Sequence, residues 1–326
     1  MNTVKIGIIG TGWIAEKMAI TLEGMEGVEA YAVASRQLQT ACDFADRWGF
    51  TRAYGSYEEM LDDEEVELVY IATPHSHHFE HARMSLLKGK AVLCEKAFTA
   101  NARQAEKLLN LAKEKELFIT EAIWTRYMPL SHTINDLVTS GIIGRPMTLS
   151  TNLGYPIGNR ERLRQPALAG GALLDLGVYA LNFASMVFGT DVERVTSTCV
   201  KTDTGVDAQN SITLTFKDGK IAVVHSSMLS MTDRQGIISG DKGHLIIENI
   251  NNPQRIRVVT EDYKTAVVYN CPPQITGYEY QVYASMEALR NGWLESPYMP
   301  HAETLRIMRM MDDLRREWGV HYPADE

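Results

Sequence analysis

The chain has 326 residues, of which 45% are hydrophobic and 22% are charged. This balance is ordinary for a globular protein and excludes disordered and fibrous classes. At about 150 residues per domain, the length predicts two domains. Acidic residues number 41 and basic residues 32, and the net charge of −9 argues against a general nucleic-acid surface.

Signals for export, membrane insertion and metal binding are weak. The first residues lack the pattern of a signal peptide, and no apolar run approaches the ~18 residues of a membrane span. The four cysteines, Cys42, Cys94, Cys199 and Cys271, lie far apart and lack zinc-site spacing. We therefore expect a cytoplasmic protein with no membrane partner. Cys94 could be a nucleophile, but no histidine flanks it, and a packing role is the better interpretation.

The first third of the chain alternates strand-like apolar runs with helical periodicity, which is typical of an α/β domain with a parallel sheet. Expected strands cover residues 4–9, 28–34, 67–72, 91–94 and 117–121. Expected helices cover residues 13–23, 37–48, 57–61, 77–88 and 101–115, the last with Thr99 as its N-cap.

After about Glu121 the pattern changes to consecutive strands separated by short turns, which predicts a mostly antiparallel sheet in a second, α+β domain. These strands cover residues 147–151, 195–201, 211–216, 221–228, 243–248, 256–260 and 266–269. Helices are expected over residues 174–188, 277–291 and 301–317.

A glycine-rich turn follows the first strand and precedes the first helix. In this context the motif Gly10-Thr11-Gly12-Trp13-Ile14 brings backbone amides to the pyrophosphate of a dinucleotide at the helix N-terminus. We expect all five of these residues to contact the cofactor.

The second strand ends without the acidic residue that usually binds the ribose of NAD. Ser35 and Arg36 stand there instead, and an arginine pairs well with a phosphate. The expected cofactor is therefore NADP, with NAD possible.

The third strand ends at Thr73-Pro74-His75, at the sheet edge where ligands of parallel sheets bind. These residues and His78 are expected beside the cofactor. Because His77 and His81 would share a helical face, a metal site is an alternative. No Asp, Glu or Cys completes a ligand set at motif spacing, so no metal is expected.

A later strand ends at Glu95-Lys96, two charges after an apolar run. With the glycine turn upstream, the chain resembles the Gfo/Idh/MocA family of oxidoreductases. The stretches 121–127 and 170–179 resemble in particular the branch that contains the dimeric dihydrodiol dehydrogenases.

The resemblance implies a Rossmann domain over residues 1–122 and a substrate-binding and dimerisation domain over residues 123–326, with a large open sheet whose outer face makes a homodimer or higher oligomer. It implies catalytic roles for Lys96, Tyr179 and Asp175. The family's Pro after the lysine is Ala97 here, which leaves the orientation of Lys96 less fixed. The Asn often found in its T-P-N turn is His75.

Hydride transfer to or from a carbon that bears oxygen needs a group that exchanges the hydroxyl proton. A free tyrosine has a pKa near ~10, and a neighbouring ammonium would bring it closer to working pH. Tyr179 is thus expected to be the acid/base, with Lys96 as its electrostatic partner. Asp175 would share a helical face with Tyr179 and bind substrate, or be a helix N-terminal residue favoured by the dipole.

Four further residues are candidates for contacts with the cofactor or the small-molecule substrate. Trp124 and Arg126 follow the fifth strand and are expected near the cofactor, although Trp124 could be core. Arg162 lies in a basic loop and is expected to contact substrate, although loop arginines are usually solvated. Glu95 could bind the cofactor ribose or hold Lys96.

The expected activity is NADP-dependent oxidoreduction of a sugar, polyol, dihydrodiol or dicarbonyl. Two other classes stay open. One is a non-catalytic NADP-binding regulatory protein on the same fold. The other is a lyase or isomerase in which the cofactor is oxidised and reduced within one turnover.

Overall fold

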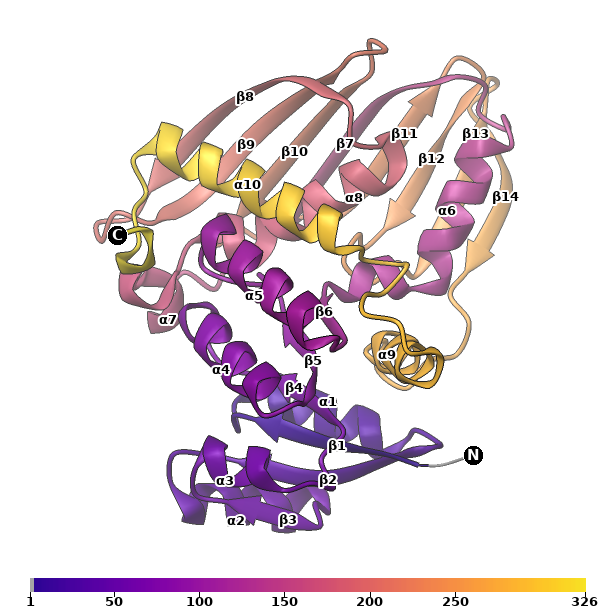
Figure 1. Ribbon diagram of the computed structural model, residues 1–326. Helices are drawn as coiled ribbons and strands as arrows, with labels where there is room; N and C mark the ends of the chain where they lie inside the picture. Colours follow the sequence, from indigo (N-terminus) through magenta and orange to yellow (C-terminus); the bar gives the residue numbers. More distant parts are fainter. Residues whose placement is uncertain (1–2) are drawn as a thin grey trace. The chain divides into compact units, whose positions relative to one another are not determined.

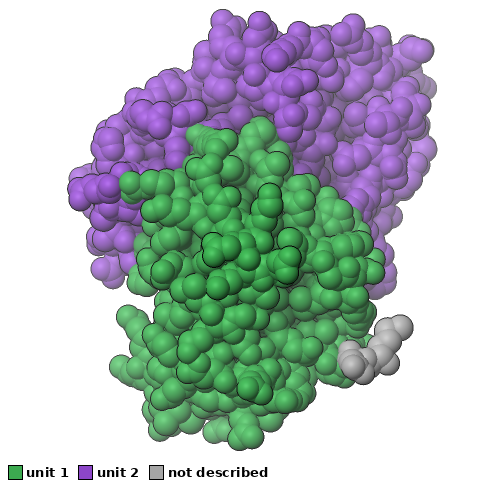
Figure 2. Space-filling view, viewed as in Figure 1, with its two compact units in different colours: residues 1–123, 274–309 green, residues 124–273, 310–326 purple. Residues whose placement is uncertain are grey.

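The computed structural model describes residues 3–326, and the chain forms two compact units (Figures 1 and 2). Unit 1, green in Figure 2, contains the residues up to Ile123 together with Gln274–Arg309. Unit 2, purple, contains Trp124–Pro273 and Met310–Glu326. Each unit has its own sheet.

Unit 1 is built on sheet A, in which six parallel strands have the order β3-β2-β1-β4-β5-β6. The strands are β1 (Val4–Ile9), β2 (Val28–Ala34), β3 (Arg52–Tyr54), β4 (Leu68–Ile71), β5 (Ala91–Glu95) and β6 (Ile119–Ala122). All residues of β4, β5 and β6 are buried, as expected where helices cover a parallel sheet. The predicted parallel sheet is confirmed, and β3 is an additional strand at its edge.

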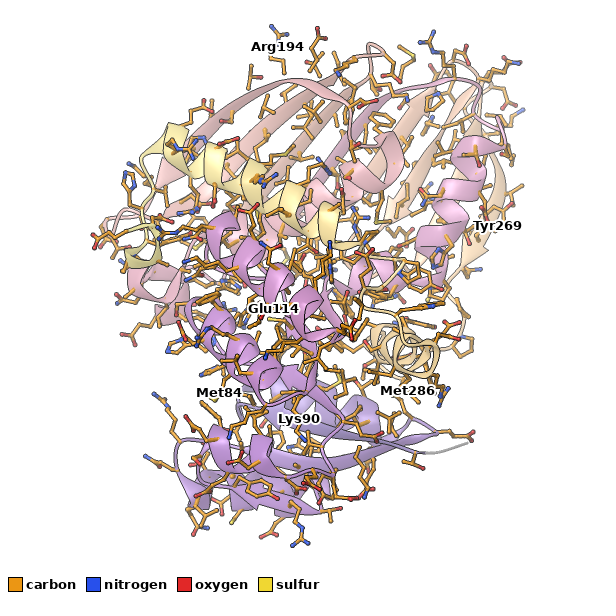
Figure 3. The ribbon with its side chains drawn as sticks, viewed as in Figure 1. Met84, Lys90, Glu114, Arg194, Tyr269 and Met286 are labelled. Atoms are coloured by element: carbon orange, nitrogen blue, oxygen red, sulfur yellow. The ribbon has the colours of Figure 1, made fainter. Side chains whose placement is uncertain are left out.

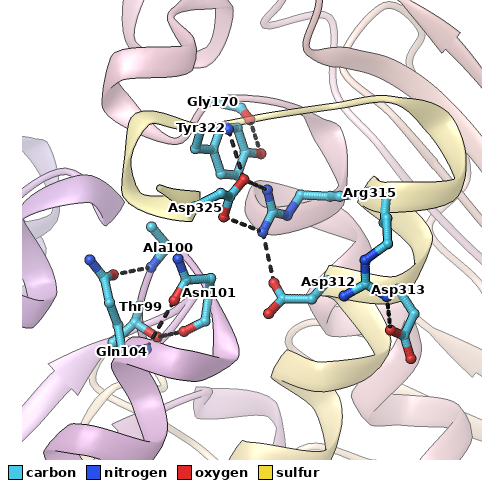
Figure 4. Close-up of polar contacts among 11 residues, drawn as sticks. Thr99, Ala100, Asn101, Gln104, Gly170, Asp312, Asp313, Arg315, Tyr322 and Asp325 are labelled. Atoms are coloured by element: carbon cyan, nitrogen blue, oxygen red, sulfur yellow. Dashed lines mark hydrogen bonds and ion pairs between the residues drawn. The ribbon is translucent and has the colours of Figure 1, made fainter.

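The helices of unit 1 that connect successive strands of sheet A are α1 (Trp13–Glu23), α2 (Leu38–Trp48), α3 (Tyr57–Asp62), α4 (His75–Leu87) and α5 (Ala102–Lys115). The later segment of unit 1 adds α9 (Glu279–Asn291) and the part of α10 (His301–Trp318) up to Arg309. The prediction of Thr99 as the cap of α5 was wrong. Asn101 is the N-cap and its side chain accepts from the Gln104 N–H at 2.9 Å, whereas Thr99 donates to the Asn101 carbonyl (Figure 4).

Unit 2 is built on sheet B, in which eight strands have the order β14-β13-β12-β11-β7-β10-β9-β8. They are β7 (Pro146–Gly154), β8 (Val192–Lys201), β9 (Asp207–Phe216), β10 (Ile221–Ser227), β11 (Gly236–Gly240), β12 (Gly243–Glu248), β13 (Arg255–Thr260) and β14 (Thr265–Asn270). Only the β7–β10 pair is parallel, so the prediction of a mostly antiparallel sheet is confirmed. Arg194 and Tyr269 mark its two edge strands in Figure 3.

Helices cover one face of sheet B, because η3 and α8 contact β7 and β10, and α6 contacts β13. The helical segments of unit 2 are η1 (Trp124–Tyr127), α6 (Pro129–Thr139), α7 (Glu161–Arg164), η2 (Pro166–Leu168), η3 (Leu173–Gly177), α8 (Val178–Phe188), the end of α10 and η4 (Pro323–Asp325).

The helix predicted over residues 174–188 begins one residue earlier and has two parts. Leu173–Gly177 forms a π-helical turn, and α8 continues from Val178. The stretch Pro166–Phe188 is long and apolar enough to cross a membrane by length and composition alone. The most apolar 18-residue part of this stretch is 89% buried inside the protein, which is the environment of a core helix.

Candidate active site

The predicted site residues fall into two groups, one in each unit. In unit 1 they follow the carboxyl ends of β1, β2, β4 and β5. The sheet order reverses between β1 and β4, and a crevice at such a point is where open parallel sheets bind ligands. Sheet A therefore brings the four predicted cofactor segments to one edge.

The glycine turn connects β1 to α1, and its two glycines meet different surroundings. Gly10 has φ +104°, and a Cβ there would lie 3.0 Å from the Ala72 carbonyl oxygen. Gly12 is the N-cap of α1, and a Cβ there would meet no heavy atom of residues 3–326 within 4 Å. The space beside Gly12 is thus open at a helix N-terminus, which fits the close approach of a dinucleotide pyrophosphate.

Arg36 follows β2 and is exposed. Its positive charge affects the pKa values of three ring side chains. Burial lowers the pKa of His81 to about 4, with His77, His78 and Arg36 adding to the effect. Burial, and then Arg36, also lowers the pKa of His77. Burial raises the pKa of Tyr57, and Arg36 opposes this rise.

Contacts between the rings join these residues into one cluster. The rings of His77 and His81 stack at 5.7 Å, and the His81 ring meets Tyr57 edge-on at 4.6 Å. The sequence predicts Ser35 and Arg36 at the cofactor, while it gives His77 and His81 only a possible metal role and does not single out Tyr57, which the structure places in the same cluster. Their signal was the i, i+4 histidine pair directly after the third strand.

The Thr73-Pro74-His75 segment leads into α4, which begins at His75, two residues earlier than predicted. His78 is fully buried, with Nε2 2.8 Å from the Thr73 carbonyl oxygen and Nδ1 2.9 Å from the Ala97 carbonyl oxygen. Burial lowers the pKa of His78 to about 4, although hydrogen bonds to carbonyl oxygens favour the protonated ring. His78 thus links the end of β4 to the residue that follows Lys96.

Glu95 is buried at the end of β5, and Lys96 follows it at the edge of the sheet. The Tyr70 hydroxyl donates to Glu95 Oε1, and the Lys96 N–H donates to Glu95 Oε2 at 3.2 Å. Glu95 therefore holds the backbone of Lys96. The Lys96–Ala97 peptide bond is cis although Ala occupies position 97.

Buried Glu121 on β6 supports the same loop, because its Oε1 accepts the Phe98 N–H at 3.1 Å. Sequence reasoning quoted Glu121 in a motif without giving it this role. Burial, and then Glu121 and Glu95, raises the pKa of Cys94 well above its usual value. A thiol in this setting stays protonated, so Cys94 is a packing residue rather than a nucleophile.

In unit 2, Asp175 lies in the π-helical turn of η3 and pairs with Arg162 of α7. Arg162 Nη1 and Nη2 lie 3.1 Å and 3.2 Å from Asp175 Oδ1, and Nη2 lies 3.5 Å from Oδ2. The Asp175 side chain is 7% exposed and that of Arg162 is 39% exposed. Two residues predicted to meet substrate are thus brought together, with the arginine on the open side. π-Helical turns within helices are frequent at functional sites.

Tyr179 lies in the first turn of α8, four residues after Asp175, and is largely buried. Arg126 of η1 binds the same helix further along, because its Nε donates to Asn182 Oδ1 at 2.6 Å and its Nη2 to Ser185 Oγ at 3.4 Å. Trp124 of η1 is also buried. Arg126 therefore anchors the helix that carries Tyr179.

The histidines of α4 have partners within the protein. Thr73 Oγ1 lies 3.0 Å from His81 Nδ1, and His75 meets His78 edge-on with ring centres 5.7 Å apart. In the described part of the chain, no three His, Cys, Asp or Glu side chains are placed to hold a metal ion.

Two protein-family models match the chain. The model of an oxidoreductase family with an NAD-binding Rossmann fold matches residues 4–122, and the GFO/IDH/MocA C-terminal domain matches residues 131–246. Together they cover more than half of the chain.

Relatives and solved structures agree with these models. Trans-1,2-dihydrobenzene-1,2-diol dehydrogenase of Mus musculus is 32% identical over 98% of each chain. The NADP-dependent D-xylose 1-dehydrogenase of Hypocrea jecorina is 35% identical over 98% of this chain and 93% of its own. KijD10, a 3-ketoreductase from Actinomadura kijaniata solved with NADP, is 26% identical with a TM-score of 0.88, over 97% of this chain and 98% of its own. The chain belongs to the Gfo/Idh/MocA oxidoreductase family and is an NAD(P)-dependent oxidoreductase.

Proposed function

We propose that the protein transfers a hydride between NADP and a hydroxyl-bearing carbon of a sugar, polyol or dihydrodiol, or the matching carbonyl. Tyr179 is the acid/base, Lys96 stabilises the reacting oxygen, and Asp175 with Arg162 binds the substrate. The relatives that act on a dihydrodiol and on D-xylose support this substrate class.

The observation that carries the proposal is that Arg162 of α7 pairs with Asp175 of η3, and that Tyr179 follows four residues later in α8. The carboxylate of Asp175 can accept from substrate hydroxyls, and the exposed side of Arg162 can donate to substrate oxygens. Tyr179 lies one turn further and has a hydroxyl that can exchange a proton. A polar, hydroxyl-rich substrate fits this set of donors and acceptors.

When bound, the nicotinamide supplies the site that accepts or donates the hydride. In the oxidation direction, Tyr179 acts as its phenolate, and its oxygen takes the substrate hydroxyl proton as the carbon gives up its hydride. The ammonium of Lys96 stabilises the oxygen that bears partial negative charge during this step. Glu95 and His78 hold the backbone on either side of Lys96, which keeps its side chain at the end of β5.

The test is a substrate panel with NADP and NAD. Trans-1,2-dihydrobenzene-1,2-diol, D-xylose, other sugars and polyols are incubated with each oxidised cofactor, and dicarbonyls are incubated with NADPH or NADH. Both the absorbance of the reduced cofactor and the product are followed. Product formation with an equal change in NADPH supports the proposal. Product without net NADPH change would indicate the lyase or isomerase class, and tight NADPH binding without any product would indicate a regulatory protein.

Self-association is proposed to use the outer face of sheet B. Exposed apolar side chains on its strands support this, namely Val200, Ile221, Val223 and Val268. Val223→Lys should convert a dimer to a monomer in sedimentation velocity, whereas Met231→Lys, at an exposed loop position, should not. A dimer that survives Val223→Lys would contradict this assignment. None of the four cysteines forms a disulfide in the described residues, which fits the proposed cytoplasmic location, where thiols stay reduced.

A further inference from the structure

Asp207 is a fully buried carboxylate at the start of β9, and its strongest contact is with the segment that carries Asp175 and Tyr179. Its Oδ2 accepts the Leu173 N–H at 2.6 Å and Asn210 Nδ2 at 2.9 Å. Leu173 is the first residue of η3, and its N–H is one of the donors that the start of a helix leaves without a helical partner. Asp207 therefore acts as a cap supplied by the sheet.

The backbone before η3 is shaped around this carboxylate. Gly171 has φ +115°, and a Cβ there would lie 2.2 Å from Asp207 Oδ1. Any larger residue at this position would displace either the carboxylate or the turn. A glycine at position 171 therefore lets the chain pass directly over Asp207.

The polar contacts continue from Asp207 along the sheet to the other end of η3. Asn210 Oδ1 accepts from Ser226 Oγ of β10 at 2.9 Å. A Cβ at Gly177, the last residue of η3, would lie 3.2 Å from the same Ser226 oxygen. Both ends of the π-helical turn therefore lie against one row of side chains, Asp207, Asn210 and Ser226, with Asp175 between them.

The C-terminal segment holds the approach to this turn. The Tyr322 hydroxyl donates to the Gly170 carbonyl oxygen at 2.5 Å, and the Arg315 guanidinium lies 4.2 Å from the centre of the Tyr322 ring. Arg315 is fixed in turn by Asp312 at 2.7 Å and Asp325 at 2.8 Å (Figure 4). Residues at the end of the chain thus fix the backbone immediately before Gly171.

The charges around Asp207 are few. Burial raises the pKa of Asp207 to about 7, against the Leu173 N–H, the Asn210 amide and the positive charge of Arg315. Burial, followed by the charge of Asp207, raises the pKa of Tyr322 well above its usual value and that of Cys199 to about 12. Both groups stay neutral, so the fixed charges of this region are Arg315 with its carboxylates and Lys201, which is paired with Asp207 across β8 and β9 and opposes the rise in the pKa of Cys199.

We propose that Asp207 is a positioning residue, which holds the start of the π-helical turn so that Asp175 and Tyr179 are correctly oriented for the reaction. It does not touch the substrate. This inference rests on the proposed function, because it acts through the residues to which that function is assigned. The ionised carboxylate accepts both N–H groups, and its protonation would weaken this hold within the neutral pH range.

The test compares Asp207→Asn and Asn210→Ala with Asp218→Asn, which changes an exposed carboxylate in the turn after β9. For each of these variants and the original protein, kcat and KM are measured across pH 5–9, and kcat is expressed per site that binds NADPH. Asp207→Asn should lower kcat by about 10-fold or more and remove the ionisation near neutral pH from the kcat profile. Asn210→Ala removes a hydrogen bond to the ionised form and should move that ionisation to higher pH. Asp218→Asn should match the original protein.

A purely structural role would reduce the number of folded sites without moving the pH profile. If Asp207→Asn does not fold, the shift expected for Asn210→Ala decides the question. Unchanged kcat and an unchanged profile in the variants that fold would overturn the proposal. Tyr179→Phe, assayed alongside, separates the positioning role of Asp207 from the catalytic role of Tyr179: if this variant stays active, the proposed acid/base role of Tyr179 fails. If it is inactive while the Asp207 and Asn210 variants behave as the original protein, only the positioning role fails.

Discussion

Arg162 contacts Asp175 through both terminal nitrogens of its guanidinium, and this pair joins a partly exposed residue of α7 to a buried carboxylate of the π-helical turn. A carboxylate with so little exposure is costly to leave without its charged partner. The pair therefore fixes the carboxylate at the place where we expect substrate hydroxyls to bind.

Replacing Arg162 tests this pair. Arg162→Met should lower kcat/KM for the best substrate of the panel by about 10-fold or more, because Asp175 loses its counter-charge and the substrate loses a donor. Arg164→Met is the control, since Arg164 lies two residues after Arg162 and pairs with the exposed Asp203 instead. It should change kcat/KM by less than about 2-fold. Equal losses in both variants would contradict the role of Arg162.

Cofactor selectivity is expected to depend on Arg36. Arg36→Ala should weaken NADPH binding by about 10- to 100-fold, the loss expected for charge-assisted hydrogen bonds to a phosphate, and NADH binding by much less. Arg47→Ala, an exposed residue of α2 that pairs with Glu16, is the control. Dissociation constants from fluorescence titration decide the outcome. A similar loss for both cofactors would argue against a contact between Arg36 and the 2′-phosphate.

The two glycines of the turn should respond differently to alanine. Gly12→Ala should leave the melting temperature nearly unchanged, because the added Cβ meets no atom of the described chain within 4 Å, yet weaken NADPH binding. Gly10→Ala should lower stability by about 1–3 kcal/mol, because its φ of +104° disfavours a side chain. Thermal unfolding and NADPH titration separate these effects. Full NADPH affinity in Gly12→Ala would remove the evidence for close backbone approach.

Stability should depend on pH through Asp207. Its pKa in the folded protein is about 7, above the value of about 3.9 expected in the unfolded chain. The folded state therefore binds more protons between these values, so this contribution to stability is complete below about pH 4 and is lost as pH rises to about 7. Relative to Asp207→Asn, the original protein should lose stability over that range in urea unfolding. A constant difference between the two proteins would contradict the raised pKa.

Much of the fold follows from local patterns in the sequence. The runs Val4–Ile9 and Val28–Ala34 were predicted with their observed bounds, because long apolar runs between turn signals leave little choice. Strand β3 has only three residues and no alternation, and β11 begins and ends with glycine, so neither gave a strand pattern. Both are formed by pairing with neighbouring strands rather than by local preference.

In the candidate site, too, local motifs could be predicted from the sequence and contacts between distant segments could not. Lys96, Asp175 and Tyr179 are predicted from motif positions, and Arg36 from the missing acid after β2. The contacts of Asp207, Glu121 and Tyr322 join segments far apart in the sequence, so no local spacing announces them. The π-helical turn was also missed, since its residues have the periodicity of an ordinary helix.

The central claim is that Tyr179 exchanges the proton during hydride transfer to or from NADP. The most direct measurement is the turnover of Tyr179→Phe, which keeps the ring and removes only the hydroxyl, together with its NADPH dissociation constant. We expect kcat to fall by about 100-fold or more, with NADPH affinity unchanged within about 2-fold. Turnover close to that of the original protein, with a normal NADPH dissociation constant, would contradict the claim.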